Sequence, residues 1–219
     1  MTNILALPCN AEPADIVTFT NADWRDTFVF LVAGQAAGYP ASGNTGNGTL
    51  VVSEVAAQAA LGTHTIEIVE TPAGAPARYV VRTPNEVPSA IGVTGATIAA
   101  GGLTLSLAQG ATAFVVGDTF AIAVMPVPLD VTGIRFDLML RRSAAAATVS
   151  LFASSAPGID TIVNGGATGA AAMAVMRDAM EDLASGSYAY DLVASADGAT
   201  FVPYFGTVEH RRGITTVVT

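Results

Sequence analysis

Short runs in which large apolar residues alternate with small or polar ones recur along the chain, and each run is bounded by Gly, Pro or Asn. The clearest examples are residues 103–107 (LTLSL), 120–124 (FAIAV) and 133–140 (GIRFDLML). Alternation with a period of two places the larger side chains on one face of a pleated strand. The 22 Gly and 11 Pro residues suit strands joined by tight turns. This pattern predicts an all-β fold.

Two breaks in the pattern indicate how the chain is organised. Residues 34–48 (GQAAGYPASGNTGNG) have the composition of a linker or surface loop. The MPVP segment at 125–128 interrupts a strand pattern, because proline cannot donate a backbone hydrogen bond. We therefore expect two small β-sandwich or barrel-like modules. Residues 41–125 form one module, which is inserted into the other, formed by residues 1–40 and 126–219.

Local patterns predict individual elements within these modules. We expect strands in the insert at residues 49–55, 63–70, 77–83, 103–108 and 118–124. In the flanks we expect three hairpins, formed by residues 16–32, 133–153 and 187–208, the last with an Asp197-Gly198 turn compatible with type I′. One short helix is predicted at 170–183, where good helix formers precede Gly186 and where Met173, Met176 and Met180 would pack in the core.

The chain carries few charges and is acidic overall. Charged residues make up 12% of it and hydrophobic residues 51%, against about 25% charged residues in an average globular protein. A neutral surface of this kind is expected where partner subunits cover it. The net charge of −9 argues against nucleic-acid binding. The longest apolar runs fall short of a membrane span, so no membrane insertion is predicted.

Residues that carry acid–base, metal or phosphate chemistry are scarce. His64 lies in a strand pattern and is interpreted as a structural strand residue. The glycine-rich stretch 43–48 lacks the Gly-Lys-Ser/Thr ending of a phosphate-binding loop. Asp178, Glu181 and Asp182 have the spacing of a solvated helix face. The single cysteine, Cys9, excludes an intrachain disulfide.

Two aspartates are interpreted as turn residues. Asp118 and Asp197 adjoin glycines, and their carboxylates are expected to accept local backbone hydrogen bonds. Either could bind calcium, although neither has the regular acidic spacing of a dedicated calcium loop. We predict no catalytic, cofactor or metal site, and therefore a protein that is not an enzyme.

Two sets of segments resemble proteins of tailed phages. The β domain of lambdoid-type capsid decoration proteins is resembled by residues 44–50 (NTGNGTL), 62–66 (GTHTI) and 110–120 (GATAFVVGDTF). Phage tail or upper-baseplate proteins with a small β domain are resembled by residues 24–28 (WRDTF), 129–133 (LDVTG), 180–192 (MEDLASGSYAYDL), 206–208 and 213–215. Together the two resemblances cover nearly the whole chain.

The resemblance implies a non-enzymatic structural component of a tailed-phage virion, assembled in the host cytoplasm. It would act as a tail, baseplate or tail-fibre-attachment scaffold through contacts with other virion proteins and with copies of itself. Trp24, Tyr188 and Tyr190 are the candidate interface residues, because aromatic side chains dominate interface energetics. Two alternatives are a capsid decoration (cement) protein and a receptor- or carbohydrate-binding virion module. The single Trp and 7% aromatic content offer little for sugar stacking.

Overall fold

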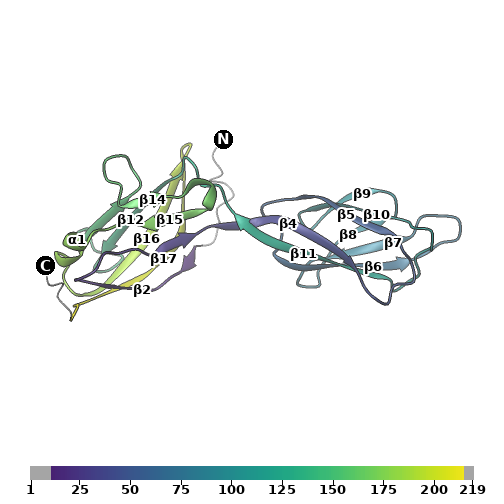
Figure 1. The fold of residues 1–219 in the computed structure, drawn as a ribbon, viewed down its shortest axis with the longest axis horizontal. Helices are drawn as coiled ribbons and strands as arrows, with labels where there is room; N and C mark the ends of the chain where they lie inside the picture. The colour runs from purple at the N-terminus through teal and green to yellow at the C-terminus, as the bar shows by residue number, and fades with distance from the viewer. Residues whose placement is uncertain (1–10, 215–219) are drawn as a thin grey trace. The chain divides into compact units, whose positions relative to one another are not determined.

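The computed structural model describes residues 11–214 and divides the chain into two compact units (Figure 1). Unit 1 consists of Met1–Phe30 and Pro128–Thr219, and unit 2 of Leu31–Val127. Strands are the main regular elements of both units and helix is scarce, so the all-β prediction is confirmed. The sheets of the described part are open, and none closes into a barrel.

The first boundary between the units lies at residues 30–31 rather than near residue 40. The stretch expected to be a loop begins within strand β4 (Leu31–Pro40), which lies beside β11 (Thr119–Pro128). Small residues are required here because a Cβ at Gly34 would lie 2.1 Å from Val127 Cγ2, and one at Gly38 would lie 2.7 Å from Leu50 Cδ2. The glycines of β4 therefore allow close packing instead of marking a linker.

The large sheet of unit 1 has six strands in the order β1-β17-β16-β12-β13, with β2 also paired to β17. The strands are β1 (Glu12–Pro13), β2 (Ile16–Phe19), β12 (Arg135–Arg141), β13 (Leu151–Ser154), β16 (Gly186–Ala196) and β17 (Ala199–Arg211). The predicted pairing of β12 with β13 is confirmed. So is the β16–β17 hairpin, where Asp197 and Gly198 have φ angles of 51° and 79°, as a type I′ turn requires.

The predicted hairpin at residues 16–32 is wrong. Strand β2 pairs in parallel with the far end of the chain, with Ile16 opposite Val208. Strand β3 (Thr27–Val29) instead joins a three-stranded sheet in the order β14-β15-β3. The Trp24 segment between them forms a single bridge to Val175 rather than a hairpin turn. Pairing between residues so distant in sequence leaves no local signal.

The predicted helix at 170–183 is mostly wrong. Its first residues form β15 (Ala170–Met173), between β14 (Ile162–Asn164) and β3. A helix follows only at α1 (Arg177–Glu181), and a 3-10 turn, η2 (Gly166–Thr168), precedes β15. Alternate burial along β15 and pairing with two flanking strands outweigh the high helix propensity of alanine, because tertiary contacts contribute more free energy than propensity does. Met173 and Met180 are buried as expected, whereas Met176 is exposed.

The core of unit 1 lies between its two sheets. Phe30 stacks on Phe136 with ring centroids 5.1 Å apart. Phe28, from the small sheet, contacts Tyr204 at 5.1 Å and Tyr190 at 6.2 Å, both from the large sheet. The unit is thus a sandwich, and the large sheet keeps a second face that points away from the small one.

Unit 2 is a second sandwich, with a five-stranded sheet in the order β4-β11-β6-β7-β8 and a three-stranded sheet in the order β5-β10-β9. The remaining strands are β5 (Thr49–Val55), β6 (Gly62–Glu70), β7 (Arg78–Arg82), β8 (Pro88–Val93), β9 (Thr97–Ala100) and β10 (Leu103–Ala108). The five strands predicted in this region are confirmed. The MPVP segment does not end β11, but its ladder with β6 stops at Val124.

Candidate interaction surface

The three aromatic residues predicted as interface anchors lie inside unit 1. Trp24 is 2% exposed, Tyr188 1% and Tyr190 5%. Their polar atoms have internal partners, because Trp24 Nε1 donates to Asp26 Oδ2 at 2.7 Å and Tyr188 donates to the carbonyl of Ala184. Side chains so deeply buried offer no area to a partner. This prediction is therefore corrected, and the exposed surface of unit 1 must be described from other residues.

The alternation of side chains between the two faces of strand β16 explains the error. Tyr188, Tyr190 and Leu192 alternate on the buried face, together with Ala194. The intervening residues, Asp191 among them, point to the opposite face of the sheet. Reading Leu192 and Ala194 as core residues would have assigned both tyrosines to the core from sequence alone.

The outward face of the large sheet carries a row of apolar side chains interrupted by one charge. Asp191 on β16 lies opposite Met139 on β12 and Phe205 on β17. The row continues to Phe152 on β13 and Pro13 on β1. Phe205 is 45% exposed and Phe152 38%. Large apolar side chains on this face of the sheet are therefore partly exposed to solvent.

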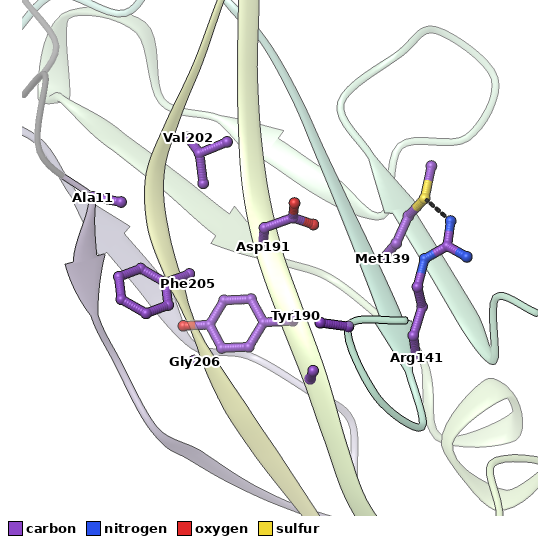
Figure 2. Close-up of a pocket in the computed structure, with 10 residues that line it drawn as sticks. Ala11, Met139, Arg141, Tyr190, Asp191, Val202, Phe205 and Gly206 are labelled. Carbon is purple, nitrogen blue, oxygen red and sulfur yellow. Dashed lines mark hydrogen bonds between the residues drawn. The ribbon is translucent and has the colours of Figure 1, made fainter. Parts of the chain in front are cut away.

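A shallow hollow of about 390 Å³ lies over this row (Figure 2). Figure 2 shows Val202 and Phe205 on one side of Asp191 and Met139 on the other. Arg141 forms the far wall, where its Nη1 donates to the carbonyls of Ala146 at 2.8 Å and Ala147 at 2.7 Å. The lining is mainly apolar, and it also includes Ala11, Ala144, Ala189, Tyr190 and Gly206.

Tyr190 and Asp15 hold the segment at residues 14–15, which follows Ala11 of the hollow, against the large sheet. Burial, together with the negative charges of Asp15 and Asp26 and the nearby Tyr204, raises the pKa of Tyr190 to about 12. The phenol stays neutral and donates to the Ala14 carbonyl at 2.7 Å. Hydrogen bonds from the Thr207 hydroxyl and amide lower the pKa of Asp15. The first contact holds residue 14 against β16, and the second holds residue 15 against β17.

Removing the Tyr190 hydroxyl is expected to destabilise unit 1 slightly. Tyr190→Phe keeps the ring and leaves the Ala14 carbonyl without its donor, so we expect a loss of about 1 kcal/mol in the free energy of unfolding. Urea unfolding followed by the fluorescence of Trp24, which lies in unit 1, measures the loss. Tyr39→Phe, at an exposed position of unit 2, is the control. Equal midpoints for the two variants would contradict the assignment.

The glycine-rich stretch considered as a phosphate loop already has an internal anion. The Asp118 carboxylate is buried and accepts hydrogen bonds from the amides of Thr45 at 2.8 Å, Gly46 at 2.9 Å and Val115 at 3.0 Å. The local bond to Val115 was expected of a turn aspartate. The bonds to residues 45 and 46 were not, because nothing near Asp118 in the sequence indicates them. The amides that would bind a phosphate are thus occupied by the protein's own carboxylate.

The remaining candidate residues do not converge. His64 is buried in β6, and its Nε2 lies 2.8 Å from the Ala60 carbonyl. Glu181 pairs with Arg177 at 3.1 Å on the exposed face of α1. Within residues 11–214, no three His, Cys, Asp or Glu side chains are grouped so as to hold a metal ion. None of the helices described there is long and apolar enough to cross a membrane. Cys9 lies outside the described residues.

Comparison with known proteins gives distant structural neighbours. No protein-family model and no curated protein matches the chain. The chain is similar to FlgL of Xanthomonas campestris, with a TM-score of 0.32 and 24% identity over 44% of this chain and 32% of that one. It is also similar to the flagellar junction protein FlgL from Legionella pneumophila, with a TM-score of 0.34 and 16% identity over 48% of this chain and 36% of that one. The chain thus spans about a third of the length of these proteins.

Proposed function

We propose that this protein is a non-enzymatic structural component of a tailed-phage particle, acting as a tail or baseplate scaffold through its surfaces. The observation that carries the proposal is the exposed apolar row on the large sheet of unit 1, centred on Phe205, Met139 and Phe152. Apolar surface held in water is unfavourable, and its burial against a neighbouring subunit drives association.

Unit 2 offers a second surface suited to a neutral partner. Its loops at residues 71–77 and 108–117 contain no ionisable side chain, and Val115 and Val116 there are exposed. These two loops border a hollow of about 730 Å³. A surface without charge associates with little dependence on salt, because no ion pair is screened. An apolar row on unit 1 and an uncharged surface on unit 2 suit a subunit that joins neighbours within a larger assembly.

The segments that resemble tail proteins and decoration proteins fall on different units. The tail-like segments belong to unit 1, which also carries the exposed apolar row, and this favours the tail or baseplate over the head. The decoration-like segments belong to unit 2. A decoration role would require unit 2 alone to bind the capsid, and the head therefore remains an alternative outcome of the test.

Immunogold electron microscopy of intact particles tests the proposal. Antibodies raised against the whole protein are applied to purified particles from an infected host. We expect label along the tail or at its tip. Label over the head would mean that the protein is a capsid decoration protein and not a tail scaffold. Detection only in the cell lysate, with unlabelled particles, would show that the protein is not a virion component.

A further inference from the structure

The acidic side chain in the apolar row of unit 1 points to the chemistry of a partner. Asp191 lies in β16, the strand between β12 and β17, with Met139 and Phe205 as its cross-strand neighbours. Aspartate is depleted in strands, and a carboxylate between two apolar side chains gains nothing from them. Its place there contributes little to folding, which leaves recognition as the role to consider.

The Asp191 carboxylate is also without a partner in the described chain. It makes no hydrogen bond or ion pair with any residue from 11 to 214, whereas six other carboxylates form ion pairs with arginines there. Arg141, across the hollow, is engaged elsewhere. Its Nη1 donates to two loop carbonyls and its Nη2 lies 3.5 Å from Met139 Sδ. Arg141 keeps its positive charge, but these donors are used, so the Asp191 carboxylate keeps its acceptors free for a donor from outside the described chain.

We propose that this hollow binds a basic side chain, arginine or lysine, of a partner protein. The alkyl part of such a side chain would lie against Phe205 and Met139, and its cationic head would reach Asp191. Figure 2 shows these three residues around one opening. Apolar contact and charge pairing would then act on the same group.

The net charge of the chain favours a different protein over a second copy as the partner of this hollow. The chain has a net charge of −9 and no lysine, so two copies repel each other. A partner with a basic surface is attracted by the same charge. This inference rests on the proposed function for the setting in which the partner is met, and it adds the chemistry by which unit 1 selects that partner.

A titration with a small cation tests the site without the particle. Amide chemical shifts of the isotope-labelled protein are followed while n-butylguanidinium is added, with n-butanol as the uncharged probe of similar alkyl length. We expect saturable shifts in β12, β16 and β17 with n-butylguanidinium and much smaller ones with n-butanol. Higher salt is expected to weaken the binding.

Two variants separate the Asp191 contact from a general effect of charge. Asp191→Asn is expected to weaken n-butylguanidinium binding by roughly fivefold, as loss of an exposed ion pair allows. Asp182→Asn removes the same charge from unit 1 at an exposed residue outside the hollow and is expected to bind like the unaltered protein. The same spectra show whether each variant is folded. Equal binding by Asp191→Asn, or equal shifts with n-butanol, would overturn the inference.

The outcomes of the two tests are distinguishable. If n-butylguanidinium binds as expected but the particles carry no immunogold label, the virion role is rejected and the cation site is kept. A negative titration with label on the tail would reject the cation site alone.

Discussion

Replacing Asp118 by alanine is expected to lower the free energy of unfolding of unit 2 by about 3 kcal/mol, since each buried donor left unsatisfied costs about 1–3 kcal/mol and some regain water. The carboxylate accepts three amide hydrogen bonds, from Thr45, Gly46 and Val115. It therefore ties the glycine-rich loop to the segment that precedes β11. The variant removes the acceptor of all three bonds at once.

The same contact makes unit 2 sensitive to acid. Burial raises the pKa of Asp118, but the hydrogen bonds from the three amides outweigh it and hold the pKa below the ordinary value of 3.8. The unfolded chain therefore takes up a proton at a higher pH than the folded one does. The stabilisation from Asp118 is complete above the unfolded value and is lost as the pH falls through the folded pKa.

Hydrogen exchange measured by mass spectrometry checks this prediction within unit 2. Peptides covering residues 40–50 and 110–120 are expected to lose protection in Asp118→Ala at pH 7. In the unaltered protein they should lose it only in strong acid. Glu86→Gln, which removes an exposed carboxylate of the same unit, is the control and should match the unaltered protein. Unchanged protection in Asp118→Ala would show that water replaces the carboxylate.

Sequence patterns predicted the strands that keep one face buried, because period-two alternation is a direct consequence of the pleat. Residues 103–107 and 120–124 show this, since both occupy strands of the unit 2 core. Strand β4 was missed because Gly34 and Gly38 are needed for packing, since a side chain at either position would clash with Val127 or Leu50. Such a requirement exists only in the folded structure.

The candidate surface was harder to predict than the fold. Aromatic residues are favoured at interfaces and in cores alike, so residue type alone could not place Tyr188 and Tyr190. Their spacing from Leu192 could have done so. The row that includes Asp191 and Phe205 depends on the register between β16 and β17 and on the pairing of β12 with β16. The long-range pairing in this row has no local sequence signature.

Replacing His210 by alanine is expected to destabilise unit 1 by about 3 kcal/mol, through two lost hydrogen bonds and a cavity in the core. The His210 ring is buried on β17. Its Nε2 donates to the Met180 carbonyl at 3.0 Å and its Nδ1 accepts from the Thr18 hydroxyl at 2.9 Å. One neutral imidazole thus joins β2, β17 and α1, and this arrangement fixes its tautomer.

Protonation breaks this arrangement, so acid should weaken unit 1 in a range set by His210. Burial lowers the pKa of His210, and the positive charge of Arg142 lowers it further, while the carbonyls of Met180 and Leu183 oppose the shift. The unfolded chain binds a proton below its ordinary value of 6.5 before the folded one does. The stabilisation is therefore complete above that value and is lost as the pH falls toward the folded pKa, at up to about 1.4 kcal/mol per pH unit.

Urea unfolding followed by Trp24 fluorescence between pH 7.5 and pH 5 measures this dependence in unit 1. His210→Gln keeps a donor and an acceptor but cannot take up the proton, so its stability should change less over the range. His64→Gln alters the other histidine, which lies in unit 2, and should leave the pH dependence reported by Trp24 unchanged. A flat profile for the unaltered protein would mean that Thr18 turns to accept a hydrogen bond from a charged ring. The link between β2 and α1 would then survive acid.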